Sequence, residues 1–204
     1  MLRRRFAVAL AAAATVILSA PFVQQAFTAA SNTWGAQFRA VGIAASALPV
    51  GIALLVAARR IRDHRLARYL MLAASLAIAA IYILIEALSF AEAFHFVEYG
   101  LLAWLFYGVV RTRDDGALIV LPLLASLLVG TLDEWFQWFI PIRVGEARDI
   151  LLNGVASGCG LLFAMAIDSP TGPIATIRRR SVVHVRLWGG VAVAVFGLFF
   201  VTVH

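Results

Sequence analysis

The sequence has no lysine and a single cysteine, and charged side chains make up only 14% of its 204 residues. A soluble globular domain has about 25% charged residues, so this composition excludes an ordinary soluble domain. Cys159 lies inside an apolar run and has no second cysteine to pair with, which excludes an intrachain disulfide and a cysteine-based zinc site. All 17 basic residues are arginines, which we attribute to genome composition rather than to mechanism.

Hydrophobic residues are abundant instead, at 63% of the chain. A run of roughly 20 apolar residues can cross a bilayer as a helix, so the sequence predicts an all-α, polytopic transmembrane bundle of about seven spans. The expected spans cover residues 6–27, 40–58, 69–88, 95–110, 117–136, 150–167 and 187–203. The first also resembles a signal peptide whose cleavage would leave six spans, but its apolar run is long for that role.

The positions of the arginines predict the orientation. Of the 17 arginines, 14 precede the first span or lie in the connections after the second, fourth and sixth spans, which share one side of the membrane. Because cytoplasmic connections are enriched in basic residues, we expect a cytoplasmic N-terminus. The net charge of +6 is explained by this topology, and nucleic acid is not a predicted partner.

Two sets of polar residues interrupt the apolar pattern. Glu92, His95 and Glu98 recur at every third residue at the start of the fourth span, and such positions share a helix face. The second set runs from the end of the fifth span to the start of the sixth: Asp133, Glu134, Gln137, Arg143, Arg148, Asp149 and Asn153. An ionisable group near the bilayer centre costs ~2.5–3.5 kcal/mol on insertion scales, so such residues are usually functional. The predicted topology places both sets at the outer membrane face.

Structural explanations remain open for several of these residues. Asp149 is also well placed to cap the sixth helix, and Asn153 to hydrogen-bond a neighbouring helix. The whole set also fits a buried ionic network that holds helices together without chemistry.

The polar residues follow the motifs of a known family. One run resembles the first motif of VanZ-like membrane proteins: Glu92-x-x-His95-Phe96-x-Glu98-Tyr99-Gly100. Two later runs resemble its second and third motifs: Leu132-Asp133-Glu134-x-x-Gln137 with Pro141-x-Arg143, and Arg148-Asp149-x-x-x-Asn153. Three ordered motifs are a more specific signal than one short pattern. The resemblance covers residues 69–167 and implies a multi-pass protein of the bacterial cytoplasmic (inner) membrane.

The resemblance also divides the chain. Residues 1–68 form an N-terminal transmembrane hairpin with an arginine-rich cytoplasmic loop, residues 69–167 the VanZ-like core, and residues 168–204 a basic loop with a C-terminal span. The family is named after a determinant of resistance to the glycopeptide teicoplanin. That name records a phenotype and assigns no reaction.

We interpret the polar sets as a site for an anionic, lipid-linked cell-envelope component. His95 and Glu98 are the expected acid/base pair, since histidine titrates near neutral pH, and Asp133 and Glu134 would orient His95 or hold a divalent cation. No spacing specific enough to predict a zinc site is present, and the sequence does not identify a cofactor. The expected substrate-binding residues are Glu92, Gln137, Arg143, Arg148, Asp149 and Asn153.

Two alternatives stay open besides an enzyme or binder in the lipid bilayer. The first is a non-catalytic membrane scaffold, or a subunit that binds a membrane protein partner, whose polar network is structural. The second is a transporter, which the sequence favours less because the charged groups gather at one face and no inverted repeat is evident.

Overall fold

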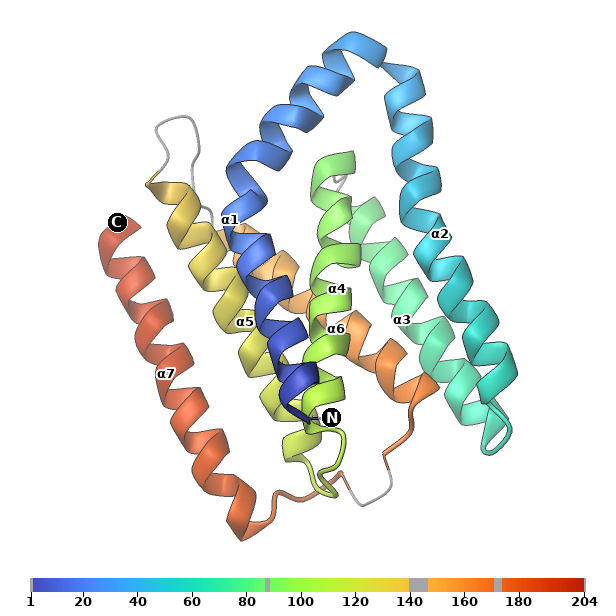
Figure 1. The fold of residues 1–204 in the computed structure, drawn as a ribbon, viewed down its shortest axis with the longest axis vertical. Helices are drawn as coiled ribbons and strands as arrows, with labels where there is room; N and C mark the ends of the chain where they lie inside the picture. Colours follow the sequence, from blue (N-terminus) through green and yellow to red (C-terminus); the bar gives the residue numbers. More distant parts are fainter. Residues whose placement is uncertain (1, 87–88, 140–146, 171–173, 204) are drawn as a thin grey trace.

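The computed structural model describes residues 2–86, 89–139, 147–170 and 174–203, and every element in them is an α-helix (Figure 1). Among these described residues, six helices are long and apolar enough to cross a membrane, which confirms the predicted fold class. The helices are α1 (Leu2–Trp34), α2 (Ala36–Arg60), α3 (Arg65–Ile85), α4 (Phe90–Val110), α5 (Ala117–Trp138), α6 (Ala147–Ile167) and α7 (Arg179–Val203).

The first helix is longer than expected and broken. Its halves, Leu2–Ala20 and Gln25–Trp34, are bent by 62° relative to each other, and counting them as one span brings the number to seven. Pro21 falls in the break. A proline inside a helix removes a backbone hydrogen bond, which explains why the bend occurs at this point.

The fourth helix begins earlier than hydropathy indicates, because its start is capped. The Ser89 hydroxyl accepts a hydrogen bond from the Glu92 backbone N–H at 3.2 Å, and the Glu92 carboxylate accepts one from the Ser89 N–H at 2.7 Å. This capping box satisfies two donors at the helix start. As a result, Glu92 and His95 both lie within regular helix.

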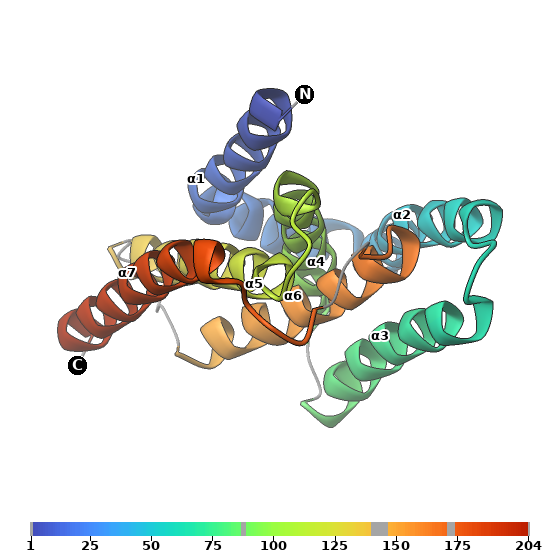
Figure 2. The ribbon, with the colours of Figure 1, turned by 90° about the horizontal axis from the view of Figure 1, so that it is seen from below.

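Helix α4 is central to the bundle and packs against α1, α2, α5 and α6. Helix α6 runs obliquely behind α4, while α2 and α3 lie on one side and α7 on the other (Figures 1 and 2). The crossing of α4 and α6 is tight, because a Cβ atom on Gly160 would collide with the backbone of Gly100, 2.6 Å from its carbonyl carbon. Small residues at a helix crossing allow this approach.

The connections α2–α3, α4–α5 and α6–α7 lie together with the N-terminus at one end, the lower end in Figure 1. We call it the arginine-rich end, and the opposite end the site end. At the arginine-rich end Asp168 pairs with Arg111 at 3.2 Å and with Arg60 at 3.7 Å. Arg68 donates to the carbonyl oxygens of Ala166 and Ile167, which caps the last turn of α6.

Candidate functional site

Polar side chains from α4, α5 and α6 meet toward the site end. The Tyr99 hydroxyl on α4 donates to Asp133 Oδ2 on α5 at 2.9 Å. His95 Nδ1, one turn earlier on α4, lies 2.7 Å from Asn153 Oδ1 on α6, and the rings of His95 and Tyr99 stack with centroids 5.7 Å apart. We call the group the polar cluster: His95, Glu98, Tyr99, Asp133, Glu134, Gln137 and Asn153.

His95 is half-buried, and its partner fixes the orientation of its ring. Because Asn153 presents a carbonyl oxygen, which can only accept, His95 Nδ1 is the donor of this hydrogen bond. In the part of the chain that the structure describes, no hydrogen bond is made to Nε2. The arrangement is that of a base whose second nitrogen is held by an orienting group.

The carboxylates of α5 lie deeper than His95. Glu134 has no exposed surface and Asp133 only 3%, and the Gln137 side-chain amide donates to Glu134 Oε1 over a long 3.5 Å. Glu98 is half-buried on α4, where His95 favours its negative charge and Asp133, a like charge, opposes it. Burying carboxylates is costly unless they are hydrogen-bonded or paired, so their neighbours are part of the cluster's stability.

A glycine makes room for this arrangement. A Cβ atom on Gly130 would lie 3.2 Å from Asn153 Cβ and Nδ2 and 3.4 Å from Tyr99 Cε1. Asn153 has no exposed surface, and its backbone carbonyl accepts a hydrogen bond from the Ser157 hydroxyl at 2.7 Å. The absent side chain of Gly130 therefore allows α6 to bring Asn153 between α4 and α5.

Glu92 and Arg148 lie outside the polar cluster, at the surface. Arg148 NH1 is 3.3 Å from Glu92 Oε1, and Arg148 NH2 is 3.7 Å from Glu86 Oε2. These pairs connect the end of α3 to the starts of α4 and α6. Asp149 lies in the first turn of α6, as expected from the sequence. Arg143 is outside the described residues.

Sequence reasoning did not assign a role to Tyr99, Gly130 or Glu86. Tyr99 follows His95 by one helical turn, and this spacing was a usable signal. Nothing in the sequence marks Gly130, because its role depends on how α6 crosses α5. A divalent cation at Asp133 and Glu134 was one expectation, and among the described residues no three His, Cys, Asp or Glu side chains are grouped to hold a metal ion.

The fold and the six apolar helices define a polytopic helical membrane protein. No family model, no curated protein and no solved structure matches the chain.

Proposed function

We propose that this is a VanZ-like membrane protein whose polar cluster binds or modifies an anionic, lipid-linked component of the cell envelope. The observation that carries the proposal is His95, half-buried at the edge of the cluster, with Nδ1 held by Asn153 and its ring stacked on Tyr99. The residues involved belong to the three motifs from which the resemblance was drawn. Such convergence of titratable groups is typical of functional sites.

His95 is the acid/base group of the proposed site. Nε2 accepts a proton from a hydroxyl or a water, and Nδ1 stays bonded to Asn153 during the transfer. The charge that His95 gains is favourable beside Glu98, with which it interacts electrostatically. Asp133 acts indirectly, because its hydrogen bond from Tyr99 fixes the ring on which His95 stacks.

Arg148 is the described residue best suited to receive a phosphate. Its guanidinium has five donors in a planar fork that matches phosphate oxygens. Its present partners, Glu92 and Glu86, are surface carboxylates, and exposed ion pairs contribute little free energy. A ligand phosphate can therefore replace them at low cost. By the predicted topology, this exchange takes place at the outer membrane face.

A structural role is the second candidate, and a different observation favours it. Asp133, Glu134, Gln137 and Asn153 are each at most 3% exposed, which is typical of a closed network that fixes helix packing. On this reading the protein is a scaffold, or a subunit that docks a membrane protein partner.

Replacing His95 tests the proposed chemistry. We expect a deletion strain to accumulate a phosphate-bearing lipid-linked species, and the wild-type gene to restore the lipid profile. His95→Gln should leave the profile as in the deletion strain at an equal level of membrane-inserted protein. Lipidomics measures the outcome, with teicoplanin susceptibility recorded on the same strains. A His95→Gln strain with the wild-type lipid profile excludes the acid/base role.

Glu134→Gln separates a site from a scaffold. It keeps size and hydrogen-bonding capacity but removes a buried charge, so a functional site predicts lost complementation with unchanged thermal unfolding in detergent. A structural ion pair predicts destabilisation by roughly 3–5 kcal/mol. Glu86→Gln, which removes an exposed charge of the same type, is the matched control.

A further inference from the structure

A cavity lies at the arginine-rich end, at the opposite end of the bundle from the polar cluster. It has a volume of about 530 Å³ and lies between the start of α1, the end of α4, the α4–α5 connection and the start of α7. Its lining residues are Leu2, Arg3, Phe6, Val109, Val110, Thr112, Arg113, Asp114, Arg180 and Ser181. We call it the basic cleft.

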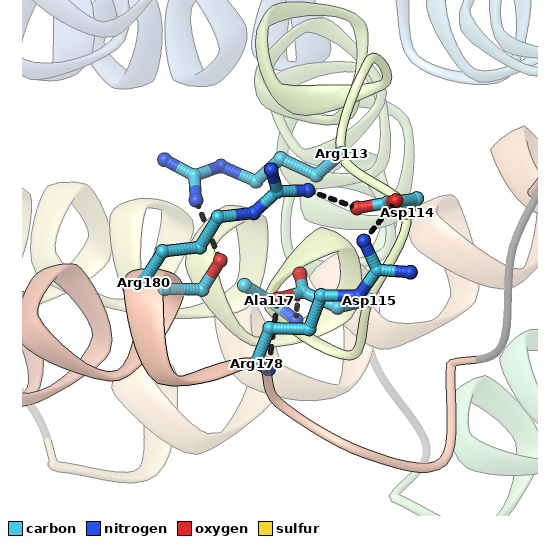
Figure 3. A network of polar contacts seen from close by, with 7 residues as sticks. Arg113, Asp114, Asp115, Ala117, Arg178 and Arg180 are labelled. Atoms are coloured by element: carbon cyan, nitrogen blue, oxygen red, sulfur yellow. Dashed lines mark hydrogen bonds and ion pairs between the residues drawn. The ribbon is translucent and has the colours of Figure 1, made fainter.

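The two walls of the basic cleft are held in place by hydrogen bonds. Arg5 NH1 donates to the Gly108 carbonyl at 3.1 Å, which fixes the start of α1 against α4. On the opposite side, Arg113 NH1 donates to the Ser181 hydroxyl at 3.0 Å, and Arg180 NH2 pairs with Asp114 at 2.6 Å (Figure 3). These bonds fix the positions of both walls.

Backbone bonds next to the cleft strengthen this arrangement. The buried Asp115 carboxylate accepts from the backbone N–H groups of Ala117 at 3.2 Å and Arg178 at 3.0 Å (Figure 3). The Gly116 N–H donates to the Thr176 carbonyl at 2.8 Å. These contacts tie the segment before α7 to the α4–α5 connection, which sets the position of Arg180.

Positively charged side chains outnumber negatively charged ones in the lining of the basic cleft. Arg3, Arg113 and Arg180 face the cleft with one carboxylate, Asp114, so the lining is positive. Arg3 makes no ion pair among the described residues, and the side chain of Arg180 is 68% exposed despite its pair with Asp114. Guanidinium donors are thus available to an anion with several oxygens.

The rest of the lining is apolar and continues the membrane spans. Val109 and Val110 are the last residues of the span in α4, and Leu2 and Phe6 are 59% and 49% exposed at the start of α1. A free phosphate cannot bury this apolar wall. A lipid can, because its acyl chains cover the wall while its headgroup contacts the arginines.

We propose that the basic cleft binds the phosphate headgroup of an anionic phospholipid, with the acyl chains along Leu2, Phe6, Val109 and Val110. This site is separate from the polar cluster and does not depend on the function proposed for it. Its selectivity for charge comes from Arg3, Arg113 and Arg180.

Native mass spectrometry of the full chain in detergent tests the proposal with three ligands: phosphatidylglycerol, phosphatidylcholine with the same acyl chains, and inorganic phosphate. We expect phosphatidylglycerol to bind most tightly. A basic residue near an anionic lipid contributes a factor of about five in affinity, so Arg3→Gln and Arg113→Gln should each weaken this binding about fivefold.

The matched controls are Arg4→Gln on α1 and Arg186→Gln on α7, which remove the same charge outside the cleft lining. Their phosphatidylglycerol affinity should equal that of the wild type. Because Arg3 has no ion pair to lose among the described residues, Arg3→Gln should also melt like the wild type without lipid. Equal losses for Arg4→Gln and Arg3→Gln, or equal binding of phosphatidylcholine, would overturn the proposal. If inorganic phosphate binds as tightly as phosphatidylglycerol, the acyl chains do not contribute to binding and the bound phosphate need not belong to a lipid.

Discussion

The Tyr99 hydroxyl donates its hydrogen bond to Asp133, a carboxylate with only 3% of its surface exposed. Tyr99→Phe removes this donor and keeps the ring that stacks on His95. A hydrogen bond to a charged group contributes ~1.5–3 kcal/mol, and we expect a loss of that size in the free energy of unfolding. Unfolding of detergent-purified protein measures it.

Tyr82→Phe on α3 is the control for the Tyr99 substitution, because among the described residues the Tyr82 hydroxyl makes no hydrogen bond and its ring contact with Phe96 is retained. Adding Asp133→Asn to Tyr99→Phe should give less than the sum of the two single effects, since the two residues share one hydrogen bond. Strictly additive effects would mean that the bond contributes nothing to stability.

The Asp115 carboxylate makes the stability of the folded protein depend on pH. Burial raises the pKa of Asp115, but hydrogen bonds from Ser181 and from the N–H groups of Arg178 and Ala117 outweigh it and hold the pKa below its ordinary value of 3.8. The unfolded chain therefore binds the proton more readily. The stabilisation is fully present above pH 3.8 and is lost as the pH falls through the lower, folded-state pKa.

The acid limb of the stability profile tests this assignment. In Asp115→Asn, unfolding measured from pH 7 down to pH 2.5 should show lower stability at neutral pH and a weaker decline below about pH 4. Asp63→Asn, in the exposed α2–α3 connection, should decline like the wild type. If Asp115→Asn loses stability with acid as steeply as the wild type, other carboxylates control acid unfolding.

For single residues, the sequence predicts which side chains belong to the polar cluster better than it predicts what they contact. His95, Glu98, Asp133 and Asn153 could be selected because each places a polar group in an apolar run. The bond from Tyr99 to Asp133 and the space left by Gly130 depend on how α4, α5 and α6 cross. These contacts join residues that are far apart in the chain, so the spacing of neighbouring residues does not predict them.

Among the elements, the crossing of α4 and α6 is the contact most sensitive to side-chain size. Gly160→Ala places a methyl group into the backbone of Gly100, and the two helices must move apart. Overpacking of this kind costs typically 1–3 kcal/mol, and we expect a loss of about 3 kcal/mol because backbone cannot rotate away. Thermal unfolding in detergent measures it.

Gly158 on the same helix supplies the matched control. A Cβ atom at Gly158 has no neighbour within 4 Å, so Gly158→Ala should be neutral or stabilising by up to about 1 kcal/mol through helix propensity. Equal melting of Gly158→Ala and Gly160→Ala would show that the close crossing of α4 and α6 does not form in the membrane protein.

The differences between the expected spans and the helices have local causes. Hydropathy finds the part of a helix inside the bilayer, whereas α4 begins at its Ser89 cap and α7 already begins at Arg179, among arginines. The break in α1 coincides with Pro21. The mean hydropathy of an apolar run does not reveal such a break. The number and order of the spans can be predicted from the sequence. The exact helix ends depend on capping residues, which hydropathy does not detect.

For the molecule as a whole, the two ends differ in chemistry. The site end carries buried carboxylates with His95, and the arginine-rich end carries ion pairs around Asp114 and Asp168 together with the basic cleft. Sequence predicted that the arginines share one end, because their connections alternate regularly with the spans. The sequence does not predict the cleft, because its lining comes from the start of α1, the end of α4, the α4–α5 connection and the start of α7, which are far apart in the chain.

The orientation of the bundle is the prediction on which the assignment of the two ends to membrane faces depends. Because 14 of the 17 arginines lie at one end, we expect that end to face the cytoplasm. A phosphatase reporter that is active only outside the cytoplasm should be active when fused after Ile142, which lies outside the described residues, and inactive after Arg113. A cytoplasmic reporter fused at the same positions should give the inverse result and controls for expression. If the phosphatase is active after Arg113 instead, the polar cluster faces the cytoplasm and an outer envelope component cannot reach His95.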